Sequence, residues 1–236
     1  VKMLFAEGWW EVQIDGKTFM LASRWGEDGF RSYRVREDLT LEHKRHFEDT
    51  DTANTGDVSA MATLDFPVRR FFFTASTEED GVTSWWMGRY GNIKERDSLG
   101  SADRLWVDNP TALDTGWVDG TAYLVIGSAG SSSLSVARVN QWGGMEVRDH
   151  VIDDLTTRFG GLGALDLFEV SGRSFVLAGG ADDGLSLFEI APGGTLLHLA
   201  SLADTAEARL SNVSAIEAHV FGDEVQIFVT SGDEAG

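Results

Sequence analysis

The chain has 236 residues, of which 42% are apolar, so it can bury a core as one large domain or two small ones. Its 38 acidic residues outnumber its 19 basic residues, and a net charge of -19 makes the surface repel nucleic acid and anionic membranes. Because it has no cysteine, it can form no disulfide, no Cys-ligated zinc site and no thiol nucleophile. No apolar run approaches the roughly 18 residues that span a bilayer.

The elements that the sequence predicts fall into a repeat of four short strands. The first unit, 9–57, has strand-like runs at 9–14, 15–23, 27–35 and 39–47, and the second, 58–109, has them at 58–66, 68–76, 79–87 and 92–99. The third, 110–161, has them at 110–118, 119–128, 131–139 and 144–152. The fourth, 162–212, has them at 162–170, 171–180, 182–190 and 195–202, and an incomplete fifth, 213–236, has two, at 213–221 and 222–231.

The third strands keep their register from unit to unit. Gly29, Gly81, Ser133 and Gly184 occupy the same place, at spacings of 52, 52 and 51 residues. The second runs, such as "SFVLAGG", are continuously apolar, which is typical of a strand buried on both faces, whereas the third and fourth alternate. We therefore predict an all-β fold, a β-propeller of four-stranded blades with four complete blades and part of a fifth. A β-sandwich is disfavoured because it needs no in-register repeat.

The number of units predicts an unclosed ring. A propeller with exposed blade faces and strand edges invites association, so we expect that the chain is a fragment of a longer polypeptide whose remainder completes the ring. The alternative is a five-bladed ring completed by an irregular N-terminal segment.

Acidic turns recur at one position of the repeat, as Asp28-Gly29, Asp80-Gly81 and Asp183-Gly184, the last preceded by Asp182. Asp-Gly is a common hairpin turn because it tolerates positive φ. A calcium loop would bring several alternating oxygen ligands, which these turns lack, so we interpret them as hairpins and keep a metal at one of them as the alternative. "GGLGALDLF", 160–168, is a near miss to the calcium-binding nonapeptide, and we interpret it as the loop that enters a first strand.

Other polar and aromatic residues give weaker signals. His43 and His46 are three residues apart on a predicted strand, so alternation places them on opposite faces, where they could not easily share a metal. The pairs Trp9-Trp10 and Trp85-Trp86 should each divide between two faces, and they either wedge between blades or offer a surface to a sugar or a protein. The remaining histidines, which lie in different units, are His150, His198 and His219.

Two known families resemble parts of the chain. The stretch 174–236 resembles the propeller-like repeat region that precedes calcium-binding nonapeptide arrays in secreted RTX-type (hemolysin-type) proteins of alphaproteobacteria. This resemblance implies export, extracellular or cell-surface placement and calcium held by a downstream roll in the full-length protein; it assigns no calcium ligand to this chain, which lacks the array. The stretches 28–43 and 183–199 are similar, more loosely, to blades of seven-bladed lactonase-type propellers.

The sequence favours a non-catalytic interaction module of a larger secreted or cell-surface bacterial protein, one that binds a protein or a glycan rather than nucleic acid and does not insert into a membrane. It predicts no catalytic, cofactor-binding or metal-ligating residue and no cofactor in this segment. The alternative is a lactonase-type hydrolase with a site at the central channel. The polar residues of the first strands distinguish the two, because their convergence on the axis would favour the enzyme; they are Asp65, Asp114, Asp166 and Glu217.

Overall fold

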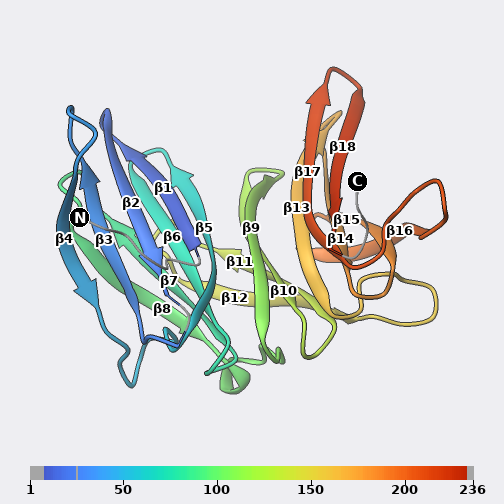
Figure 1. Cartoon of the computed structure of the whole chain (residues 1–236), viewed down its shortest axis with the longest axis horizontal. Helices are drawn as coiled ribbons and strands as arrows, with labels where there is room; N and C mark the ends of the chain where they lie inside the picture. Colours follow the sequence, from blue (N-terminus) through green and yellow to red (C-terminus); the bar gives the residue numbers. More distant parts are fainter. Residues whose placement is uncertain (1–7, 25, 233–236) are drawn as a thin grey trace.

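The computed structural model describes residues 8–24 and 26–232, which form five antiparallel sheets (Figure 1). Blade 1 contains β1 (Gly8–Ile14), β2 (Lys17–Ser23), β3 (Phe30–Val35) and β4 (Leu41–Phe47), and blade 2 contains β5 (Val58–Phe66), β6 (Arg69–Ser76), β7 (Gly81–Met87) and β8 (Ile93–Leu99). Blade 3 contains β9 (Pro110–Val118), β10 (Thr121–Ser128), β11 (Ser133–Val139) and β12 (Met145–Ile152), and blade 4 contains β13 (Leu162–Val170), β14 (Arg173–Gly180), β15 (Gly184–Ala191) and β16 (Thr195–Ala203). The partial blade 5 is the hairpin of β17 (Val213–Phe221) and β18 (Glu224–Ser231), and a 3₁₀ turn, η1 (Ser101–Asp103), precedes blade 3.

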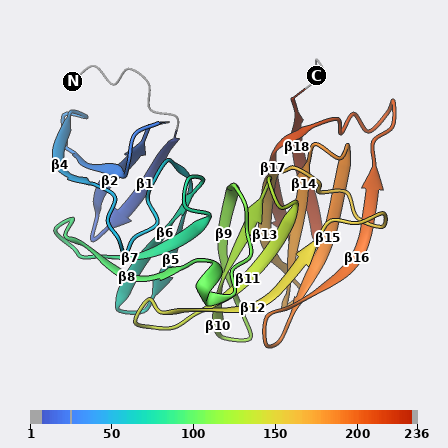
Figure 2. The ribbon, with the colours of Figure 1, turned by 90° about the horizontal axis from the view of Figure 1, so that it is seen from below.

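The arrangement confirms the predicted β-propeller. In each four-stranded sheet the strands pair in chain order, and the first strands of successive blades, β5, β9, β13 and β17, contact one another along the inside. The sheets follow an arc that opens between blade 1 and the β17–β18 hairpin (Figures 1 and 2). Among the described residues, no helix is long and apolar enough to cross a membrane. Residues 233–236 of the predicted fifth unit lie outside the described residues.

The core lies between the blades rather than inside any one of them. Each of four buried clusters joins residues of two neighbouring sheets. The apolar second strands supply much of each cluster because both of their faces are covered, and Phe71, Phe72 and Phe73 are fully buried in succession. Trp85 packs toward blade 1 and Trp86 toward blade 3, as alternation along a strand predicts.

Glycines at the turns between third and fourth strands let the blades approach closely. A Cβ on Gly143, at φ 89°, would lie 2.7 Å from the ring of Phe71 in the preceding blade. A Cβ on Gly194 would meet the Tyr123 ring of its own preceding blade at the same distance, 2.7 Å. Repeated contacts of this kind fix the blade-to-blade spacing and hence the positions of the first strands around the axis.

Candidate functional site

A row of three carboxylates crosses the innermost strands of blades 3, 4 and 5. Asp114 on β9, Asp166 on β13 and Glu217 on β17 each lie four residues before the end of their strand, so they occupy one position of the repeat. We call Asp114, Asp166 and Glu217 the carboxylate row. Because the first strands of neighbouring blades contact one another, residues about 52 positions apart in the sequence are brought to one level of the arc.

Asp65 does not belong to this row. The sequence analysis grouped it with the other three polar residues of the first strands, but it lies at a different position of its strand. It lies one residue before the end of β5 and binds Arg70 on β6 through an ion pair. The residues of blades 1 and 2 that correspond to the row are Trp10 and Ala62. The sequence does contain this difference, because Asp65 is closer to its hairpin turn than the three carboxylates of the row are to theirs.

The row is anchored by backbone hydrogen bonds between blades. Leu167 on β13 donates its N–H to Oδ2 of Asp114 at 2.8 Å, and Thr115 donates its N–H to Oδ1 of the same carboxylate at 2.7 Å. In the next blade, Ala218 donates its N–H to Oδ2 of Asp166 at 2.7 Å. Asp114 and Asp166 each thereby satisfy a backbone N–H on the first strand of the following blade, and this fixes the orientation of both side chains.

Burial raises the pKa of Asp114 from its ordinary 3.8 to about 6, despite the two amide hydrogen bonds that act in the opposite direction. The negative charges of Asp166 and Glu217 contribute to this rise. Burial also raises the pKa of Asp166, and the charge of Glu217 adds to it, whereas the hydrogen bond from Ala218 opposes it. The negative charges along the row therefore act on the protonation of both aspartates, as expected for coupled carboxylates.

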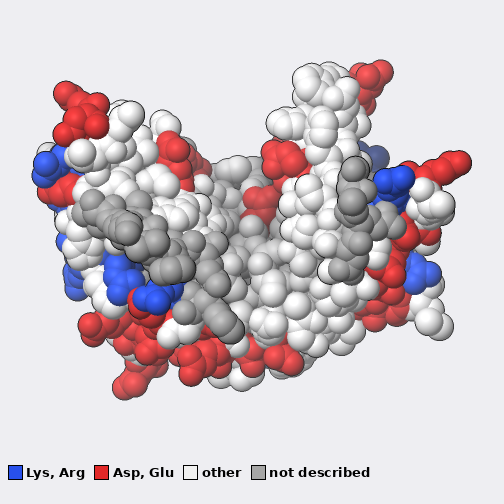
Figure 3. Space-filling model, viewed as in Figure 1, with Lys and Arg blue, Asp and Glu red and all other residues white. Residues whose placement is uncertain are grey.

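The row runs from a half-buried end to an exposed end. Asp114 and Asp166 are half-buried, whereas the Glu217 side chain is 66% exposed, with Oε1 3.9 Å from Nε2 of His219. The space-filling view shows a hollow between the two ends of the arc, with acidic side chains on its wall (Figure 3). Glu217 is therefore the member of the row that is most open to solvent.

Paired carboxylates of unequal protonation can carry out acid–base chemistry, since one can donate a proton while another accepts one or attacks. Metal binding has less support: in 8–24 and 26–232 no group of three or more His, Asp or Glu side chains is placed to hold an ion.

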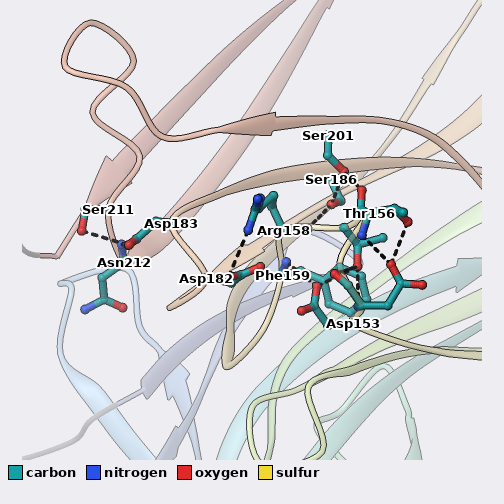
Figure 4. A network of polar contacts seen from close by, with 12 residues as sticks. Asp153, Thr156, Arg158, Phe159, Asp182, Asp183, Ser186, Ser201, Ser211 and Asn212 are labelled. Carbon is teal, nitrogen blue, oxygen red and sulfur yellow. Dashed lines mark hydrogen bonds and ion pairs between the residues drawn. The ribbon is translucent and has the colours of Figure 1, made fainter.

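Two of the acidic turns tie their blade to the next. Oδ1 of Asp183 accepts hydrogen bonds from Ser211 Oγ at 2.9 Å and from Asn212 N at 3.1 Å, in the segment that enters β17 (Figure 4). Asp80 accepts from Asn109 N at 2.8 Å in the same way before β9, and Asp182 forms an ion pair with Arg158 at 3.4 Å. These contacts support the hairpin interpretation, because the oxygens that a calcium ion would use already accept hydrogen bonds.

The predicted positive φ is present in all three turns but not at the same residue, and in the first turn it is Gly29, at 79°. Asp80 and Asp183 themselves have positive φ, 51° and 47°, while Gly81 and Gly184 do not. The glycine is needed instead because a Cβ on Gly184 would lie 2.4 Å from the carbonyl oxygen of Leu202. The stretch 160–168 enters β13 as predicted, and within it Asp166 belongs to the carboxylate row.

The prediction for His43 and His46 is wrong. A register shift between Ser32 and Tyr33 inserts one extra residue into β4, so His43 pairs with Tyr33 and His46 pairs with Arg31. Since Arg31 and Tyr33 share one face of β3, both histidines lie on that face. Two of the other histidines named in the sequence analysis have local partners: His150 contacts Ser135 Oγ, and His198 contacts Ser201 Oγ.

Comparisons with known proteins identify the fold. No protein-family model matches the chain, and no curated protein matches it. Among solved structures, it is similar to an exo-β-1,3-galactanase from Phanerochaete chrysosporium with galactose, at TM-score 0.57 and 11% identity over 90% of this chain and 54% of that one. A GH43_1 enzyme from Xanthomonas citri gives TM-score 0.54 and 13% identity over 92% and 80%. A protein from Lactobacillus plantarum gives 0.57 and 15% over 78% and 54%, so the chain spans about half the length of two of these three proteins.

These neighbours overturn the prediction of a non-catalytic interaction module. Propellers of this shape include a galactanase and a GH43_1 enzyme, and no finding points to a module that only binds. Asp114, Asp166 and Glu217 lie at equivalent positions on adjacent first strands. At 11% and 13% identity the likeness itself establishes the fold alone.

Proposed function

We propose that the chain hydrolyses glycosidic bonds at the carboxylate row. The observation that supports this most strongly is the asymmetry of the row: carboxylates occupy the position in blades 3, 4 and 5, whereas blades 1 and 2 have Trp10 and Ala62. If the carboxylates served only to tie blades together, the same residue type would be needed between every pair of blades.

Glycoside hydrolysis requires two carboxyl groups in different protonation states. In our proposal Asp166, whose pKa is raised, donates a proton to the oxygen of the leaving sugar. Glu217, whose side chain is 66% exposed, is the partner that activates water or attacks the sugar carbon. Asp114 is a positioning residue: its amide contact to Leu167 orients β13, and its own pKa is raised by burial and by the charges of Asp166 and Glu217.

The names of the structural neighbours guide the choice of substrate. One is an exo-β-1,3-galactanase, so β-1,3-galacto-oligosaccharides are the first probe, and an aliphatic lactone tests the lactonase-type alternative. Release of reducing sugar should be about 10²- to 10⁴-fold slower in Glu217→Gln and in Asp166→Asn than in the wild type. Glu224→Gln, on the neighbouring β18, is the matched control and should keep wild-type activity.

Equal rates in wild type and both variants would contradict the proposal. If the wild type hydrolyses the lactone but releases no sugar, and both variants lose lactone hydrolysis, the carboxylate row is still the site but its substrate is a lactone rather than a glycoside.

Placement outside the cell is also a proposal. A protein that hydrolyses a polymeric glycan must meet it where the polymer lies, and the RTX-type resemblance of 174–236 implies export. Recovery of the native protein from culture medium rather than from the cell lysate would support this. Calcium in a downstream roll stays a prediction about a longer polypeptide.

A further inference from the structure

A second cleft lies between blades 1 and 2, at the end where the β1–β2 and β5–β6 hairpins turn. It has a volume of about 640 Å³, within the usual range for small-ligand sites. Its walls include Asp65, Arg69, Arg70, Arg89 and Tyr90. No member of the carboxylate row lines it, so it is a separate site.

The cleft is rich in cations although the chain is strongly acidic. Three arginines, Arg69, Arg70 and Arg89, line it together with two acids, Asp15 and Asp65. Lys17 adds another positive charge at its edge, with Nζ 5.0 Å from the centre of the Tyr90 ring. Together these four cations exceed the two acids, so the charge around the cleft favours an anion in a chain that is otherwise strongly acidic.

Aromatic rings hold several of these cations. The Arg89 guanidinium lies 4.9 Å from the centre of the Tyr90 ring, and that of Arg69 lies 3.9 Å from the centre of the Trp142 ring. The carboxylate of Asp15 is 3.7 Å from Arg89, and the two side chains are 63% and 66% exposed, so this ion pair is weak and can open. A planar guanidinium packed on a ring still directs N–H groups outward to a carboxylate.

Two arginines of the cleft, Arg70 and Arg89, do not take part in a contact that repeats from blade to blade. Lys17 over Tyr90 and Arg69 over Trp142 are the same contact in successive blades, and they clasp one blade to the next. Arg70 and Arg89 have no counterpart in blade 3, where Ala122 and Gln141 stand in their places. Within the cleft Arg70 donates through Nε and Nη2 to the carboxylate of Asp65 and Arg89 pairs with Asp15, so an incoming carboxylate shares Arg70 with Asp65.

The apolar part of the lining indicates what kind of anion fits. Ile14, Phe66 and Val68 also face the cleft, and Val68 is 86% exposed. A ligand that covers these side chains and meets the arginines needs a ring with apolar C–H faces and a carboxylate. We infer that the cleft binds an acidic oligosaccharide through the carboxylates of its uronic acid units, with Arg70 and Arg89 as the main contacts.

Isothermal titration calorimetry with tri-galacturonate at low salt tests this, alongside a neutral galacto-oligosaccharide of equal length and inorganic phosphate. The acidic sugar should bind more tightly than either, and its affinity should fall as salt is added. The double variant Arg70→Gln/Arg89→Gln should bind at least about tenfold more weakly. Arg36→Gln, at an exposed ion pair on blade 1, is the control and should bind as the wild type does.

Three results would overturn the inference: no binding of the acidic sugar, equal binding of the neutral sugar or phosphate, or an unchanged affinity in the double variant. If the double variant unfolds, Arg89→Gln alone decides, since that side chain is 66% exposed. The inference does not depend on hydrolysis. Glu217→Gln should keep the affinity for tri-galacturonate, so the failure of one proposal is distinguishable from the failure of the other.

Discussion

Single glycines at the start of the third strands carry a constraint that composition does not reveal. The Asp-Gly pattern indicates a turn with positive φ, and positive φ is found at Gly29 but, in the other two turns, at Asp80 and Asp183. The glycine that follows is required because the neighbouring fourth strand comes too close for a side chain, as with Gly184 and the carbonyl oxygen of Leu202. The sequence therefore predicts the turn correctly and its physical reason only in part.

Replacing Gly184 with alanine should destabilise the protein by about 2 kcal/mol or more, because the new methyl group forces β15 and β16 apart. Gly100→Ala is the matched control, since a Cβ there meets nothing within 4 Å and its φ is -145°. Gly100→Ala should lower the free energy of unfolding by less than about 1 kcal/mol. Urea unfolding of both variants measures the difference, and equal losses would show that the close approach to Leu202 is not what selects glycine.

At the scale of the element, irregular pairing determines which face a side chain occupies. In each of blades 1 to 4 the pairing of the third and fourth strands shifts register by one residue. Strict alternation cannot anticipate such a bulge, which depends on backbone geometry rather than on hydrophobic pattern. For this reason the sequence misplaced His43 and His46, whereas it placed Trp85 and Trp86 correctly on the regular β7.

The two adjacent acids Asp182 and Asp183 provide a test of how turns join blades. Asp183→Ala removes the acceptor for Ser211 and Asn212 and puts alanine at positive φ, so it should cost about 2 to 3 kcal/mol. Asp182→Ala removes only a partly exposed ion pair with Arg158 and should cost about 0.5 kcal/mol. Thermal or urea unfolding with and without calcium measures both.

Asp183→Asn is the conservative control, because asparagine keeps the acceptor oxygen and tolerates positive φ. Its stability should stay close to that of the wild type. Two results would contradict a role of this turn in joining blades. One is an equal loss in the free energy of unfolding for Asp182→Ala and Asp183→Ala, and the other is stabilisation by calcium of the wild type but not of the Asp183 variants.

At the scale of the whole molecule, the repeat made the fold predictable and the site only partly so. A spacing of 52, 52 and 51 residues, with buried second strands, is sufficient to predict the blades. The sequence also singled out three members of the carboxylate row, but it added Asp65, whose side chain turns out to bind Arg70 at the second cleft. Their electrostatic coupling was not predictable, because it depends on burial between blades and on amide donors from the next strand.

If Asp114, Asp166 and Glu217 act as one coupled site, an NMR titration that follows the carboxyl carbons of the aspartates will show it. Asp114 should titrate near pH 6 in the wild type. In Glu217→Gln a negative charge that disfavours ionisation is lost, so the pKa values of Asp114 and Asp166 should both fall toward the ordinary 3.8. An Asp114 that titrates near 4 in the wild type, or that is unaffected by the loss of Glu217, would contradict the account.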